Sequence, residues 1–103
     1  MSRFNVVLVE DAGIVANDID QTVSEAGFEM DHKFSSGEEV LDQFETLDAD
    51  LVLMDIQLSG EMDGIETTRA LQEKYSVPVV FLTAYSNPET IERARETGAA
   101  AYL

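Results

Sequence analysis

Residues 50–64, DLVLMDIQLSGEMDG, pass abruptly from an apolar run into a polar loop that contains two glycines. Residues 50–54 predict a buried strand, because an apolar run without alternation is typical of a strand covered on both faces. Residues 57–64 show no periodicity and predict a loop, in which we expect Gly64 to supply an unusual backbone angle before a helix. Asp55 therefore stands at the carboxyl end of the predicted strand.

Similar apolar runs recur on both sides of this stretch and alternate with segments of helical periodicity. Further strands are predicted at residues 4–9, 28–34, 77–82 and 100–103, and helices at residues 12–26, 36–47, 64–75 and 87–97. Within residues 28–34 polar and apolar side chains alternate, which indicates a strand near the edge of the sheet. Strands joined by crossover helices run parallel, so the order predicts an α/β fold with a doubly wound parallel five-stranded sheet in a single domain, residues 1–103.

The charge of the chain argues against one class of partner. The sequence has 103 residues, of which 21 are acidic and 6 are basic, for a formal net charge of −15. Such a chain repels phosphate backbones, so we expect no direct contact with nucleic acid. The acidity has a simple explanation as a solvated surface, and a salt-adapted host is a weaker one. Locally, it favours a divalent cation wherever carboxylates converge.

The composition also excludes several kinds of site. No cysteine is present, which excludes a disulfide, a thiolate zinc site and a cysteine nucleophile. The N-terminal residues lack the apolar stretch of a signal peptide, and no apolar run is long enough to span a bilayer. We therefore expect a soluble cytoplasmic protein without membrane association. The sequence contains neither a GxGxxG nor a GxxxxGK[ST] motif, which argues against dinucleotide or P-loop nucleotide binding.

The residues that follow the predicted strands carry the chemistry, because ligands of open parallel sheets bind at the carboxyl ends of the strands. Glu10 and Asp11 follow the first strand, Asp55 the third and Thr83 the fourth. Each pair of these carboxylates at ~4 Å would repel by roughly 4 kcal/mol at an effective dielectric of ~20. Without an Arg or His nearby, this repulsion points to Mg2+. A carboxylate beside that metal can attack a phosphoryl group and form an acyl phosphate.

Each of these residues alone has a simpler explanation. Asp55 alone reads as a turn or helix-cap residue, and Glu10 with Asp11 as a cap of the following helix. Thr83 alone is an ordinary strand-end residue. Only the placement of all of them at one edge of the sheet favours a site. His32 lies in the alternating strand without an evident partner and is predicted to be a satisfied or exposed histidine.

Four motifs together resemble the response-regulator receiver domain. They are VVLVED at residues 6–11, LVLMDIQLSGEMDGIE at 51–66, PVVFLTAY at 78–85 and GAAAYL at 98–103. The resemblance covers residues 4–103 and implies a flavodoxin-like sheet with strand order 2-1-3-4-5. It implies a signalling phosphoacceptor rather than an enzyme. Its partners would be a sensor histidine kinase or a phosphotransfer protein, with an output domain that the sequence does not name.

The resemblance also implies a role for individual residues. Asp55 matches the phosphorylated aspartate, and Glu10 and Asp11 match the acidic pair. With Asp55 and the backbone carbonyl of Gln57, this pair would surround Mg2+. Thr83 matches the hydroxyl residue that hydrogen-bonds the phosphoryl group. Tyr102 matches the aromatic switch residue, so phosphorylation is expected to change the surface from Thr83 to Tyr102.

The chain departs from the family pattern in the loop and at the C-terminal end. Ser59 stands where a proline is commoner, and Glu61 looks inserted. The lysine that the family has shortly beyond Leu103, and its last helix, are missing. We therefore expect a C-terminally truncated receiver that binds Mg2+ and phosphorylates poorly. Lys33 and Lys74 are predicted to lie away from the site and not to replace that lysine.

Three alternative functions compete with the phosphoacceptor, and each has its own sequence argument. The chain could be a receiver-like protein-interaction module that does not phosphorylate. It could be a phosphohydrolase with an aspartyl nucleophile, although Gln57 occupies the position at which that class needs a second acid. Flavin binding on a similar sheet is the third, and no aromatic-rich phosphate loop follows the first strand to support it.

Overall fold

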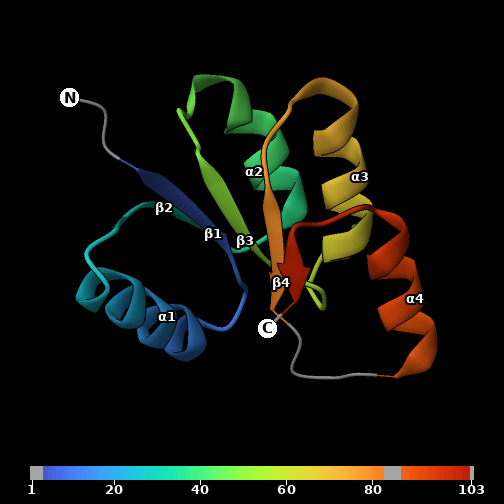
Figure 1. Ribbon diagram of the computed structural model, residues 1–103, viewed down its shortest axis with the longest axis horizontal. Helices are drawn as coiled ribbons and strands as arrows, with labels where there is room; N and C mark the ends of the chain where they lie inside the picture. The colour runs from blue at the N-terminus through green and yellow to red at the C-terminus, as the bar shows by residue number, and fades with distance from the viewer. Residues whose placement is uncertain (1–3, 83–86, 103) are drawn as a thin grey trace.

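The computed structural model of the protein describes residues 4–82 and 87–102, and it shows strands alternating with helices (Figure 1). In chain order the elements are β1 (Asn5–Val9), α1 (Gly13–Glu25), β2 (Glu29–Phe34), α2 (Gly37–Gln43), the 3-10 helix η1 (Phe44–Thr46), β3 (Leu51–Asp55), α3 (Gly64–Lys74), β4 (Val79–Leu82), α4 (Pro88–Glu96) and β5 (Ala101–Tyr102). The predicted elements are all present, and the second predicted helix is divided into α2 and η1. No helix in the described part of the chain has the length and apolarity needed to cross a bilayer.

The five strands form one parallel sheet in the order β2-β1-β3-β4-β5. This confirms the α/β prediction and the strand order that the resemblance implies. The chain folds this way because each apolar strand can bury both of its faces only if helices cross over them. The central strands β1 and β3 are accordingly the most buried, and their carboxyl ends lie side by side.

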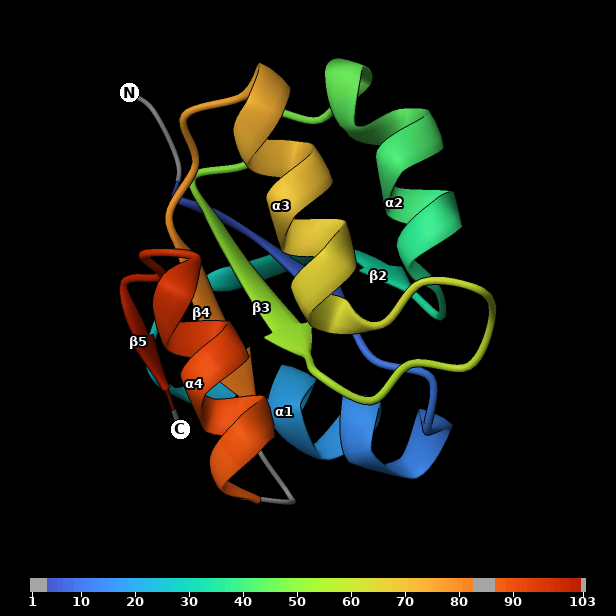
Figure 2. The ribbon, with the colours of Figure 1, turned by 90° about the vertical axis from the view of Figure 1, so that its right-hand side faces the viewer.

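Helices cover the two faces of the sheet unequally (Figures 1 and 2). One face carries α2, α3 and α4, and its core includes Val40 of α2, Leu71 of α3 and Ala94 of α4. The opposite face carries α1 among the described helices, and its smaller core is centred on Ala16. Burial of both faces fixes the direction of β1 and β3 and therefore the place where Glu10 and Asp55 emerge.

The edge strand β2 contains an irregularity that its alternating sequence does not predict. Val6 pairs with Met30 but Val7 pairs with His32, so the backbone of β2 has one extra residue at this point. Such a bulge moves the following side chains to the opposite face. Met30 therefore packs against the core beside α1, whereas Phe34 belongs to the core on the opposite face. His32 lies on the face of Phe34, and the two rings stack at a centroid distance of 6.2 Å. The predicted single alternation through residues 28–34 is wrong for this reason.

The same bulge determines the position of Lys33. Its side chain lies on the face of α1, where Nζ contacts Asp20 Oδ2 at 3.0 Å. Phe28, at the start of the predicted strand, is 45% exposed and packs against Phe4 with a ring-centroid distance of 5.4 Å. The edge of the sheet thus carries an exposed aromatic pair at one end and Lys33 at the other.

The loop between β3 and α3 differs from the prediction in its use of glycine. Gly60 has a positive φ of 110°, whereas Gly64 does not have a positive φ. Gly64 is required for another reason, because a Cβ there would overlap the backbone carbonyl of Asp55. The expectation of an unusual backbone angle at Gly64 is therefore wrong, and close packing against β3 explains this glycine instead.

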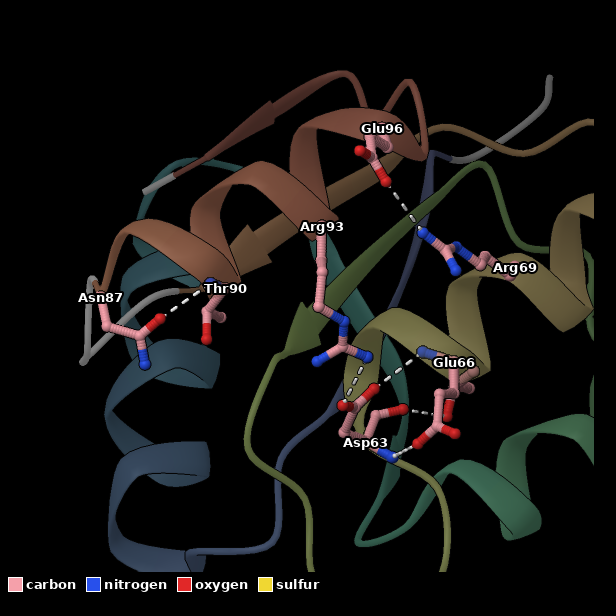
Figure 3. Close-up of polar contacts among 8 residues, drawn as sticks. Asp63, Glu66, Arg69, Asn87, Thr90, Arg93 and Glu96 are labelled. Carbon is pink, nitrogen blue, oxygen red and sulfur yellow. Dashed lines mark hydrogen bonds and ion pairs between the residues drawn. The ribbon is translucent and has the colours of Figure 1, made fainter.

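A cluster of polar contacts fixes the start of α3 and joins it to α4 (Figure 3). Asp63 Oδ1 accepts a hydrogen bond from the Glu66 N–H at 2.8 Å, and Glu66 Oε1 accepts one from the Asp63 N–H at 3.0 Å. This capping box satisfies two backbone donors at the N-terminus of α3. The second oxygen of Asp63, Oδ2, contacts Arg93 Nη2 of α4 at 3.1 Å. In α4 itself, the predicted cap is confirmed, because Asn87 Oδ1 accepts from the Thr90 N–H at 2.8 Å.

Candidate functional site

Three acidic side chains meet at the carboxyl ends of β1 and β3. Glu10 and Asp11 directly follow β1, and Asp55 is the last residue of β3. A carboxylate oxygen from each of them lies within 4.8 Å of the oxygens of the other two. The parallel pairing of β1 with β3 explains this convergence, because it delivers both strand ends to the same edge. The predicted convergence of these three acids is thus present in the structure.

The three acids differ in their exposure to solvent. Glu10 is 9% exposed, and its backbone N–H donates to the Phe34 carbonyl at 2.9 Å, which extends the β1–β2 pairing by one residue. Asp55 is half-buried and Asp11 is exposed. The site is therefore a shallow one, with the Glu10 carboxylate at its base and the Asp11 carboxylate at its outer side.

Each carboxylate accepts a hydrogen bond from a backbone N–H group of the adjoining loops. Glu10 Oε1 accepts from Ala12 at 3.2 Å, and Asp55 Oδ1 accepts from Gln57 at 3.3 Å. Asp11 Oδ2 accepts from Ser59 at 3.1 Å, across the loop that follows β3. These donors each engage one oxygen of a carboxylate, and the second oxygen of each side chain has no backbone donor among these contacts. No Lys, Arg or His among residues 4–82 and 87–102 forms an ion pair with any of the three acids.

The surroundings of Asp55 disfavour its ionised form. Burial raises the pKa of Asp55, with further increases from a hydrogen bond to the Glu10 side chain and from the negative charges of Glu10 and Asp11. The hydrogen bond from the Gln57 N–H lowers it, and the net effect raises the pKa from 3.8 to about 7.

The donor set fits a hard divalent cation. Mg2+ prefers oxygen ligands, and one or two carboxylates with water and phosphate oxygens are its usual partners in proteins. Glu10, Asp11 and Asp55 supply such oxygens within reach of one another. A divalent cation would also offset the mutual repulsion of these carboxylates, which contributes to the raised pKa of Asp55.

The structure describes the other predicted site residues only in part. Gln57 is exposed in the loop, and its N–H contacts Asp55, while its carbonyl role stays a prediction. Thr83 lies outside the described residues. Tyr102 belongs to β5, and its backbone pairs with Phe81 of β4. The side chain of Tyr102 lies outside the described part of the chain. The side chain of Lys33, predicted to lie away from the site, in fact lines a depression of about 300 Å³ together with Glu10 and Asp11. Lys74 ends α3.

Two features of the site region escaped the sequence prediction. The Ser59 backbone N–H donates a hydrogen bond to Asp11, and the residue type at position 59 does not reveal a backbone donor. The Asp63–Glu66 capping box, in contrast, has a recognisable spacing of an acceptor followed three residues later by Glu. The predicted start of this helix at residue 64 is confirmed, since α3 begins at Gly64.

Comparison with known proteins identifies the family of the chain. A family model described as the response regulator receiver domain matches residues 6–103. The transcriptional regulatory protein PdtaR of Mycobacterium tuberculosis is 35% identical over 98 residues, which cover 95% of this chain and 47% of PdtaR. The heme response regulator HssR of Staphylococcus epidermidis is 40% identical over 72 residues, or 70% of this chain and 32% of HssR. This chain thus spans less than half the length of either relative.

Solved structures show the same fold. The signal receiver domain of a modulated diguanylate cyclase from Desulfovibrio desulfuricans superimposes with a TM-score of 0.92 at 30% identity, covering 99% of this chain and 81% of that chain. The response regulator domain of Thermotoga maritima CheB superimposes with a TM-score of 0.88 at 17% identity, covering 99% of this chain and 78% of that one. The second likeness, at low identity, supports the fold alone.

Proposed function

Because this chain belongs to the response regulator receiver domain family, we propose that Asp55 accepts a phosphoryl group from a histidine kinase or a phosphotransfer protein in a two-component phosphorelay. Glu10, Asp11, Asp55 and the backbone carbonyl of Gln57 would hold the Mg2+ ion that this transfer requires. The chain is proposed to act as a cytoplasmic signalling phosphoacceptor, and not as an enzyme that turns over a substrate.

One observation carries the proposal: three carboxylate oxygens lie within 4.8 Å of one another at the end of β1 and β3, without a basic partner among the described residues. The mutual repulsion of the three carboxylates destabilises the fold, and a bound cation would offset it. An arrangement that raises the pKa of Asp55 to about 7 is typical of a functional site.

The chemical step that we propose uses the Asp55 carboxylate as the nucleophile. One of its oxygens attacks the phosphorus of a phosphohistidine, an O–P bond forms and the P–N bond breaks. The leaving imidazole nitrogen keeps the electron pair of that bond and takes up a proton from water. Mg2+, when bound, supplies positive charge that stabilises the transferring phosphoryl oxygens. The carboxylates of Glu10 and Asp11 lie beside that of Asp55 and would hold the same ion. The Gln57 N–H holds one Asp55 oxygen in place.

The proposed output is a change in surface. A phosphoryl group on Asp55 adds a charge of roughly −1.5 to −2 and three strong acceptors. In the family pattern Thr83 would donate a hydrogen bond to it, and Tyr102 would reorient in response. The altered surface would then be recognised by an output domain or a partner protein.

The decisive experiment is labelling of the protein with acetyl phosphate or phosphoramidate in the presence of Mg2+. We expect a mass increase of one phosphoryl group that EDTA prevents and that Asp55→Asn abolishes. Asp18→Asn, the same chemical change at an exposed position of α1, is the matched control and should label normally. Full labelling of the Asp55→Asn protein would exclude Asp55 as the acceptor. Binding of Mg2+ without any labelling would favour the alternative, a receiver-like interaction module.

A further inference from the structure

We propose that the protein has a second ligand site, a cavity that binds a small organic amine with an apolar body. The cavity has a volume of about 560 Å³, within the roughly 300–1,000 Å³ that is usual for small-molecule sites. It lies between the loop that leads into β3, residues 47–50, and the loop that leads into β4, residues 75–77 (Figure 1). These loops precede their strands, whereas Glu10 and Asp55 stand at the carboxyl ends of theirs. The cavity and the acidic site are therefore at opposite edges of the parallel sheet.

Part of the cavity lining is apolar and is held in place by the core. Tyr75 is half-buried, and its ring packs against that of Phe44 at a centroid distance of 4.7 Å. Phe44 is itself only 4% exposed. Leu47 and Val77 complete the apolar lining, and both pack against the same core. An aromatic ring fixed in this way can accept an apolar or cationic group without first being ordered.

The polar part of the lining is acidic. Glu45, Asp48 and Asp50 are exposed, and the described residues of the lining include no Lys, Arg or His. Within residues 4–82 and 87–102, none of these three carboxylates forms an ion pair. The net charge of −15 adds to the negative potential at this edge. The cavity therefore favours a cation and disfavours anions such as nucleotides or carboxylic acids.

The start of β1 fixes the acidic loop. The Asn5 N–H donates to Asp50 Oδ2 at 2.8 Å, and Asn5 Nδ2 donates to the Asp48 carbonyl at 3.0 Å. The Asp50 N–H donates in turn to the Asn5 carbonyl at 2.9 Å. These bonds use the backbone of Asp48 and leave its carboxylate without a donor among the described residues. The loop is thus fixed while the charge of Asp48 stays available to a ligand.

The spacing of these acids favours an organic cation over a metal ion. In the part of the chain that the structure describes, the acids whose oxygens converge closely enough to hold a metal are those at the ends of β1 and β3. Glu45, Asp48 and Asp50 form no such group. An ammonium group needs less convergence, because one carboxylate and a nearby aromatic ring such as Tyr75 can bind it. A primary amine with an aromatic body, of which phenethylamine is an example, combines both requirements.

The test follows the backbone amide signals of the isotope-labelled protein by NMR during addition of phenethylamine, with Mg2+ present. We expect saturable shifts confined to residues 44–50 and 75–77. Phenethyl alcohol, which has the same body without the charge, should bind roughly 2–5-fold more weakly, and the anion hydrocinnamate should not bind. Added salt should weaken binding of the amine and leave binding of the alcohol unchanged.

Three variants test the residues that would recognise the amine. Asp48→Asn removes one charge and keeps the backbone carbonyl that Asn5 contacts, so it should weaken phenethylamine binding roughly 2–5-fold without affecting the alcohol. Asp18→Asn, the same change at an exposed position of α1, is the matched control and should bind like the unmodified chain. Tyr75→Leu should weaken amine binding by a similar factor, whereas Tyr75→Phe keeps the ring and should bind normally.

The proposal fails on any of four results. The first is the absence of saturable shifts, and the second is equal binding of the amine and the alcohol. The third is an Asp48→Asn protein that binds phenethylamine as tightly as the Asp18→Asn protein does. The fourth is a set of shifts centred on Glu10, Asp11 and Asp55, which would place the amine at the acidic site instead. If Tyr75→Leu does not fold, the comparison of Asp48→Asn with Asp18→Asn is decisive by itself.

Discussion

The backbone of Gly64 packs directly on the carbonyl of Asp55, so closely that a methyl group on Gly64 would overlap this oxygen. Its N–H donates to the Ile56 carbonyl at 2.8 Å, one residue beyond the proposed phosphoacceptor. The first turn of α3 is therefore built against the end of β3, and the position of Asp55 depends on a residue nine positions later in the chain.

The first prediction follows from this contact. Gly64→Ala should destabilise the protein by about 1–3 kcal/mol, because backbone atoms must move to admit the methyl group. Gly13→Ala is the matched control, since Gly13 lies in α1 with nothing within 4 Å of a Cβ and without a positive φ. It should be neutral or stabilising by up to about 1 kcal/mol. Urea unfolding of both variants measures the difference, and equal stability of the two would contradict the packing argument.

The second prediction concerns the pH dependence of stability in the absence of metal. The pKa of Asp55 is raised from 3.8 to about 7 in the folded state, so the folded protein binds the proton more tightly than the unfolded chain. Asp55 therefore reduces stability progressively as the pH rises from about 4 to 7, and the full reduction is present above pH 7. Asp55→Asn removes this titration and should be more stable than the unmodified protein at pH 8, with little gain at pH 4.

Thermal unfolding in EDTA across this pH range tests the second prediction. Asp18→Asn, at an exposed position of α1, controls for the general effect of one negative charge in a chain with a net charge of −15. The gain of Asp55→Asn over this control should grow between pH 4 and pH 7. A gain that is constant across the range would show that the folded protein does not hold the extra proton.

The third prediction concerns the metal. A cation at Glu10, Asp11 and Asp55 competes with the proton that keeps the pKa of Asp55 near 7. Mg2+ should therefore raise the melting temperature at pH 8, and the increase should shrink as the pH falls below about 7. Asp11→Asn should reduce the increase while the metal-free stability changes little, because Asp11 is exposed. Calorimetric scans with Mg2+ and with EDTA at several pH values provide the measurement.

The positions of Glu10, Asp11 and Asp55 could be predicted from the sequence because they depend on strand ends, which apolar runs mark clearly. The bulge in β2 could not, because one extra residue leaves the alternation of residues 28–34 superficially intact. That bulge places Lys33 beside α1 and in the depression next to Glu10, against expectation. The hydrogen bond from Ser59 to Asp11 could not be predicted for a related reason. Its donor is a backbone N–H group, which the residue type at position 59 does not reveal. Sequence patterns identified which elements meet, and backbone detail decided which atoms touch.

The fourth prediction separates the two roles of Asp63, which caps α3 through Oδ1 and contacts Arg93 through Oδ2. Asn caps a helix about as well as Asp, whereas Ala removes the cap at a typical cost of about 1 kcal/mol. The ion pair is 44% exposed at Arg93 and 29% at Asp63, and such pairs contribute at most about 1 kcal/mol. We therefore expect Asp63→Ala to destabilise the protein more than Asp63→Asn.

A double-mutant cycle isolates the ion pair between α3 and α4. Asp63→Asn and Arg93→Gln should each cost less than about 1 kcal/mol in urea unfolding, and the double variant should cost less than their sum. High salt should reduce this coupling, while the additional cost of Asp63→Ala should stay, since a helix cap is a local hydrogen bond. Fully additive single variants would mean that other contacts hold α4 against α3, such as the Arg69–Glu96 ion pair and the packing around Ala94.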